Sequence, residues 1–161
     1  MLKIRITESV RQAAQKRADL FPESHRFKIK KGSEIYGMLG EELFLASFGG
    51  KLINNQNYDV DHPLIGKIDI KTKSCSSEPK DTYECSVAAY QMDKKECEFY
   101  VFYRVDNKLE YGWYCGILSV EDFKKKAVLR KKGEREGPYL YSADCYNVKI
   151  CELYNIDKYT K

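Results

Sequence analysis

The chain has 161 residues, of which 43% are hydrophobic and 32% are charged, and its formal net charge is +4. This length corresponds to about one domain, and the hydrophobic share is large enough for a proper core. No apolar run approaches the roughly 20 residues of a membrane span, and the first residues turn polar at once, so we expect neither a membrane segment nor a secretory leader.

The first third of the chain predicts two helices. Residues 7–19 read as a helix with a threonine cap, and residues 33–48 read as a second helix that a glycine pair ends. Gly37 and Gly40 lie inside the second helix, where each costs roughly 1 kcal/mol of helix stability relative to alanine. We therefore expect these glycines to permit the close approach of another backbone or of a ligand.

A β-hairpin is predicted next, from residues 52–60 and 65–73, with a short turn around Leu64. If the hairpin is centred on Leu64, Asp61 faces Lys67. In the same register Asp59 faces Asp69, and directly opposed side chains lie roughly 5 Å apart at Cβ.

Side chains alternate between the two faces of a strand. Ile68, Ile70 and Thr72 should therefore point toward a core. The opposite face, toward solvent or a cleft, should carry Lys67, Asp69, Lys71 and Lys73. Two carboxylates so close repel each other unless a cation lies between them, and Mg²⁺ prefers carboxylate oxygens. The plain alternative is an exposed hairpin with a mixed-charge outer face, which is common in proteins.

The remaining elements are three strands, one helix and a last strand. The strands are predicted at 83–90, 98–105 and 109–118, the helix at 119–133, and the last strand at 146–153. The near-continuous apolar run at 98–105 is typical of a central strand. Together the elements predict one α/β domain in which helices flank a mixed central sheet.

Six cysteines and two histidines indicate a reduced protein without structural zinc. No C-x-x-C pair occurs, and Cys97 and Cys115 stand in apolar or aromatic runs. Free thiols of this kind are typical of a cytoplasmic protein, which would be the host cytoplasm if a phage encodes the chain.

Basic residues gather in two segments, 25–32 and 123–135, which hold five and seven of them, counting one histidine. Such runs are usually solvated faces, but beside a metal site they would contact phosphate groups. Lys28, Lys30 and Lys31 are therefore candidate nucleic-acid-binding residues.

The order of these motifs resembles the PD-(D/E)xK nuclease superfamily, which has the restriction-endonuclease-like fold, and in particular its small phage and bacterial members. The matching segments are Gly40-Glu41, Tyr58-Asp59 and Asp69-Ile70-Lys71, and the likeness covers roughly residues 30–155. Tyr58 stands where the family pattern has proline. The resemblance implies an αβββαβ core within a single nuclease-like domain, residues 1–161. Its parts would be an N-terminal helix and basic segment (1–32), a catalytic core (33–118) and a C-terminal helix and strand (119–161).

The resemblance also implies an activity, that of a Mg²⁺-dependent DNA endonuclease in which Mn²⁺ substitutes. Asp59, Asp69, Glu41 and the carbonyl of Ile70 would hold the metal. Glu34 and Glu42 compete with Glu41 for the role of the helix carboxylate.

Three further residues receive roles from the resemblance. Lys71 would orient or deprotonate the attacking water. Gln91 would hold Lys71 or the substrate phosphate, and Lys73 would contact the DNA backbone. The alternatives are a catalytically silent module that binds nucleic acid or a partner, and a nuclease for RNA or branched DNA. The small size leaves a homo-oligomer open.

Overall fold

A six-stranded mixed sheet runs through the structure, a computed structural model that describes residues 1–20, 32–53, 55, 57–92 and 96–160. Its strands in spatial order are β1 (Leu2–Arg5), β7 (Tyr111–Ser119), β6 (Phe99–Asp106), β4 (Gly66–Cys75), β3 (Val60–His62) and β2 (Lys51–Leu52). β4 and β6 are parallel, and every other neighbouring pair is antiparallel. The predicted α/β class with a mixed sheet is confirmed, and β6 is a central strand.

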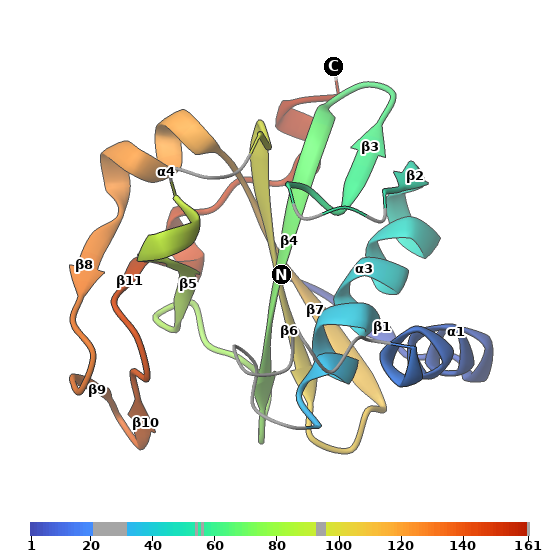
Figure 1. Ribbon diagram of the computed structural model, residues 1–161, viewed down its shortest axis with the longest axis horizontal. Helices are drawn as coiled ribbons and strands as arrows, with labels where there is room; N and C mark the ends of the chain where they lie inside the picture. The colour runs from blue at the N-terminus through green and yellow to red at the C-terminus, as the bar shows by residue number, and fades with distance from the viewer. Residues whose placement is uncertain (21–31, 54, 56, 93–95, 161) are drawn as a thin grey trace.

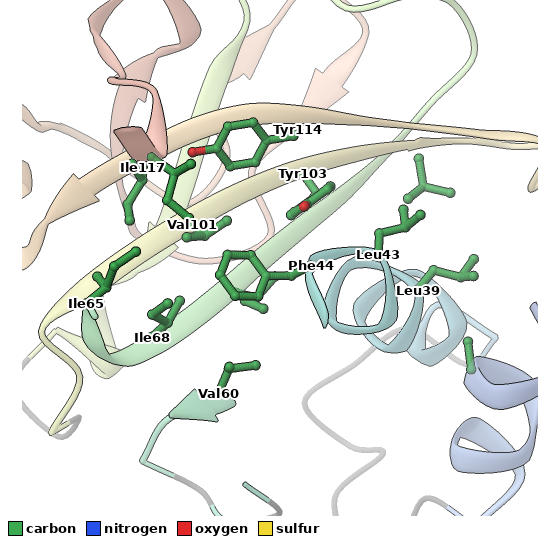
Figure 2. Close-up of a cluster of buried hydrophobic side chains, with 14 of the residues drawn as sticks. Leu39, Leu43, Phe44, Val60, Ile65, Ile68, Val101, Tyr103, Tyr114 and Ile117 are labelled. Carbon is green, nitrogen blue, oxygen red and sulfur yellow. The ribbon is translucent and has the colours of Figure 1, made fainter. Parts of the chain in front are cut away.

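Two helices lie on one face of this sheet. α3 (Glu34–Phe48) packs on the strands, and α1 (Glu8–Asp19) packs against α3 (Figure 1). Leu39, Leu43 and Phe44 of α3 meet strand residues such as Ile68 and Val101 in a buried apolar cluster (Figure 2). Among the described residues, no helix combines the length and the apolar character that a bilayer crossing requires.

A second, three-stranded sheet lies on the other side of β4 (Figure 1). It contains β5 (Glu84–Ala88), β11 (Cys145–Lys149) and β8 (Val128–Arg130), and α4 (Val120–Lys126) joins the two sheets. A short hairpin of β9 (Arg135–Glu136) and β10 (Tyr139–Leu140) extends from it. Three 3-10 turns complete the described part of the chain, at Ala89–Gln91, Ile150–Glu152 and Ile156–Lys158.

The predicted helix at 119–133 is wrong in its second half. The helix ends at Lys126, and residues from Val128 onward form β8, which pairs with β11. Val128 is β-branched and favours a strand, and pairing with a distant strand overrides the helical charge pattern. The strand predicted at 83–90 is β5, and it joins β11 in the second sheet.

The hairpin between β3 and β4 has the predicted register, but its first strand is not the predicted 52–60. β3 covers only Val60–His62, and Lys51–Leu52 form β2, which pairs back onto β3. Val60 pairs with Ile68, and Asp61 pairs with Lys67. The turn ends at Gly66, whose φ of 95° lies in the left-handed region that glycine adopts without strain.

A buried polar network ties the second sheet to the β9–β10 hairpin. The Glu84 carboxylate accepts hydrogen bonds from Arg130, from the Tyr141 hydroxyl at 2.9 Å and from the Asn147 amide at 2.6 Å. The hydrogen bonds from Arg130, ahead of the opposing effect of burial, lower the pKa of Glu84 from its ordinary value near 4.5 to about 2. Glu136 belongs to the same network, because it accepts from Tyr141 at 3.1 Å.

Because of this network, we expect the decrease of the unfolding free energy in acid to depend in part on Glu84. Its depressed pKa contributes stability that is present above about pH 4.5 and is lost as the pH falls toward about 2. Glu84→Gln should lower the free energy of unfolding at pH 7 and remove part of its decrease between pH 5 and pH 3. Urea unfolding at these pH values checks this; equal acid dependence in the two proteins would contradict it.

Gly40 sets the distance between α3 and β4. A Cβ at this position would overlap Oγ1 of Thr72, whereas a Cβ at Gly37 would meet nothing within 4 Å. The close approach expected of the helix glycines is therefore confirmed for Gly40 and absent, among the described residues, at Gly37.

The two glycines form a matched pair of test sites on one helix. Gly40→Ala should destabilise the protein by about 1–3 kcal/mol through overpacking, and Gly37→Ala should stabilise it by roughly 0.5–1 kcal/mol. Thr72→Ala in the Gly40→Ala background should recover part of the loss, because Oγ1 is the atom that collides. Urea unfolding of the four proteins measures these differences, and equal effects of the two alanines would refute the packing argument.

Candidate active site

The candidate site lies where β3 stops pairing with β4. The Asp59 N–H donates to the carbonyl of Ile68 at 2.9 Å, and its Oδ2 accepts from the Ile70 N–H at 2.6 Å. In the described part of the chain, no strand pairs with this edge of β4 beyond Ile68. The N–H and C=O of one strand residue point to the same side, so the Ile70 carbonyl also faces this open edge.

Lys71 connects the second carboxylate to the chain beyond β5. Its Nζ lies 2.8 Å from Oδ2 of Asp69 and donates to Oε1 of Gln91 at 2.9 Å. Gln91 ends the 3-10 turn that follows β5, which carries its amide back to β4. The later chain therefore brings Gln91 to Lys71 and Asp69, and the hairpin places Asp59 at the Ile70 N–H between them in sequence.

Asp69 is more enclosed than the alternation of β4 predicts. Ile68 and Ile70 point into the α3-side core as expected, but Asp69 on the opposite face is only 1% exposed. The reason is that the second sheet covers this face, where the sequence pattern predicts solvent or a cleft. Lys71 remains partly open, with 18% of its side chain exposed.

Glu41 is the helix carboxylate beside Asp69. Burial is the main cause that raises the pKa of Glu41, the Arg17 guanidinium opposes it, and the negative charges of Glu42 and Asp69 add to it. Arg17 of α1 pairs with Glu41 through Nη2 and with Glu42 through Nη1 at 3.0 Å. Glu34 begins α3, about two turns earlier, and is buried there.

Arg17 is the site residue that sequence reasoning missed. It precedes Glu41 by 24 positions and lies on a different helix. The only local signal is its place in the last turn of α1, where a basic residue is ordinary. Its partner could be found only from the packing of α1 on α3.

Of the four lysines predicted to contact phosphate, only Lys73 is among the residues that the structure describes. Lys73 is half-buried. Its Nζ donates to the Glu84 carbonyl at 3.3 Å and lies 5.0 Å from the centre of the Tyr139 ring. Burial, and then the charge of Arg104, lower its pKa. Lys28, Lys30 and Lys31 lie outside the described residues.

The donor atoms at the site suit a hard divalent cation. Asp59 accepts from the N–H of Ile70, the residue after Asp69, and the Ile70 carbonyl faces the same edge. Mg²⁺ prefers carboxylate and carbonyl oxygens of this type. Each carboxylate also has a cation or an N–H donor beside it: Ile70 N–H at Asp59, Lys71 at Asp69 and Arg17 at Glu41. The described residues contain no group of three or more His, Cys, Asp or Glu side chains arranged to hold a metal.

Comparison of the chain with protein-family models gave no match, and a search of curated proteins gave none either.

Removing Arg17 should leave the Glu41 charge buried without its counter-charge. Arg17→Met is expected to cost about 1–3 kcal/mol of unfolding free energy at pH 8. The penalty should shrink at pH 5, because the raised pKa of Glu41 lets it protonate and lose its charge. Lys16→Met, at an exposed position of the same helix, is the matched control. Urea unfolding at both pH values measures the effect; a penalty that does not change with pH, or one that Glu41→Gln fails to relieve, would contradict it.

Proposed function

We propose that the chain is a metal-dependent nuclease that hydrolyses phosphodiester bonds of DNA. The observation that carries the proposal is the position of Lys71, 2.8 Å from Asp69 and 2.9 Å from Gln91 at an open strand edge. A lysine held by two polar partners beside a buried carboxylate is costly for folding, because both charges lose hydration. Such an arrangement is typical of sites where chemistry requires it.

Lys71 is the group that we propose acts on the nucleophile. Its ammonium group would hold the attacking water and stabilise negative charge on the phosphate oxygens, an interaction that is strong where water is excluded. Asp69 and Gln91 keep its Nζ in place through the two contacts already described. The role of Gln91 is therefore to position Lys71.

Asp59 and Asp69, with the Ile70 carbonyl and Glu41, would hold a divalent cation. When bound, Mg²⁺ would lower the pKa of a coordinated water and neutralise the phosphoryl oxygens. The Ile70 N–H fixes the Asp59 carboxylate at the strand edge, and Arg17 holds Glu41 near Asp69. Both contacts hold these carboxylates in place before a substrate arrives.

We further propose that the fold is restriction-endonuclease-like. Three features support this proposal: α3 packs on the sheet through Gly40, a hairpin carries the first aspartate, and the longest strand, β4, carries Asp69 and Lys71. These features occur in the order that the family pattern requires.

Cleavage of supercoiled plasmid tests the proposal. With Mg²⁺ or Mn²⁺ the protein should nick or linearise the plasmid, and with EDTA it should not. Lys71→Ala and Asp69→Asn should each reduce the rate by about 10²-fold or more, the magnitude of a lost catalytic group. Lys67→Ala is the matched control, since Lys67 lies two positions from Asp69 on the same face and pairs with Asp61 across the hairpin.

The same proteins should be tested on branched DNA, single strands and RNA. Cleavage of one of these alone would reassign the substrate. If every nucleic acid stays whole while DNA still shifts on a gel, the chain is a binding module. Equal activity in Lys71→Ala and Lys67→Ala would place the chemistry elsewhere.

A further inference from the structure

A small cavity lies between β4, β5 and β6, and Lys71 is one of the residues that line it. Its volume is about 80 Å³, enough for one small anion, and Lys71, Lys73, Arg104 and Ser86 contribute to its wall. The register places Lys71 beside Phe102 and Lys73 beside Arg104 on the parallel pair β4–β6, so the two lysines and the arginine share one face. The cavity therefore has three cationic side chains around it.

Arg104 is buried and Lys73 is half-buried, and the two side chains lie close together despite their like charges. Both donate to one neutral atom, the Glu84 carbonyl oxygen, Lys73 at 3.3 Å and Arg104 at 2.6 Å. The charge of Arg104 is the second cause, after burial, that lowers the pKa of Lys73. Two cations that share a neutral acceptor repel each other, and an anion between them would remove that cost.

The acidic groups on the neighbouring elements are engaged in other contacts. The Glu84 carboxylate is bonded to Arg130, Tyr141 and Asn147. Glu136 interacts with the Lys73 charge, but its carboxylate accepts from the Glu84 N–H at 2.9 Å and from Tyr141. Asp69, on the same face of β4, is paired with Lys71.

Ser86 provides an independent indication of a missing acceptor. Its hydroxyl is buried and, among the described residues, has no hydrogen-bond partner. An unsatisfied buried hydroxyl costs about 1–3 kcal/mol, and this one belongs to a residue of the cavity wall. A ligand with acceptor oxygens would satisfy it.

We propose that this cavity binds one phosphate group of a nucleic-acid strand, through Lys73, Arg104 and the Ser86 hydroxyl. A phosphate offers acceptor oxygens and negative charge, which match the cationic and hydroxyl donors that this wall contains beside Cys85, Phe102 and Tyr103. That the phosphate belongs to a nucleic acid rests on the proposed function. Lys73 lies two residues from Lys71, about 6.6 Å along the strand, so the bound phosphate would be a neighbour of the one being cut.

Binding of inorganic phosphate in EDTA tests the site without any cleavage. Calorimetric titration at constant ionic strength should give one saturable site per chain. Ser86→Ala and Lys73→Met should each weaken the affinity roughly tenfold, the equivalent of one hydrogen bond to a charged group. Ser74→Ala, at an exposed position of β4, should leave it unchanged. No saturable binding, or binding that neither Ser86→Ala nor Lys73→Met weakens, overturns the proposal.

Oligonucleotides then identify the source of the phosphate. They are measured on Asp59→Asn, which keeps the cavity wall, with and without Ser86→Ala. Tighter binding of a 5′-phosphorylated strand than of its 5′-hydroxyl counterpart, lost with Ser86→Ala, assigns a terminal phosphate. Equal binding of both strands, weakened equally by Ser86→Ala, assigns an internal phosphodiester. Oligonucleotide binding that Ser86→Ala does not change overturns the proposal. If inorganic phosphate binds while no nucleic acid is ever cut, the nuclease proposal fails and the phosphate site remains.

Discussion

The burial of the Asp69 carboxylate on a central strand requires compensating polar partners, and these partners constrain the chain around it. Asp69 has almost no exposed surface, and its neighbours Ile68 and Ile70 belong to the core. A charge removed from water is tolerated only where a counter-charge and hydrogen bonds compensate for the lost hydration. Lys71 supplies the counter-charge, and Gln91 holds Lys71. The chain after β5 therefore takes a path that places Gln91 against Lys71, which compensates the buried charge of Asp69.

The parts of the structure that depend on neighbouring residues could be predicted from the sequence. The hairpin register follows from the position of the turn and from strict alternation, and the pairing of Asp61 with Lys67 confirms it. α1 is predictable because the threonine that caps it stands directly before it in the sequence, and α3 because a glycine pair directly follows it. β6 is recognisable as a central strand because its apolar run is nearly continuous, interrupted only by Arg104 before the final aspartate.

The parts that depend on distant residues could not be predicted. Val128 extends into β8 because β11 lies beside it, and nothing within residues 119–133 indicates that partner. The alternation of β4 correctly assigns Lys73 to the face of Lys71 but does not reveal that a second sheet covers that face. The ion pair of Arg17 with Glu41 likewise joins two helices whose contact no sequence period specifies.

The pairing of β1 with β7 also bears on the order in which the molecule assembles. Leu2 pairs with Tyr114, and Arg5 pairs with Tyr111, so more than one hundred residues separate the partners. Contacts between residues this distant form slowly, because closing a long loop costs entropy before any contact repays it. On the ribosome, where synthesis proceeds from the N-terminus, the first strand must wait until β7 has emerged. β1 precedes every other described strand along the chain, yet it is among the last of them to join the sheet.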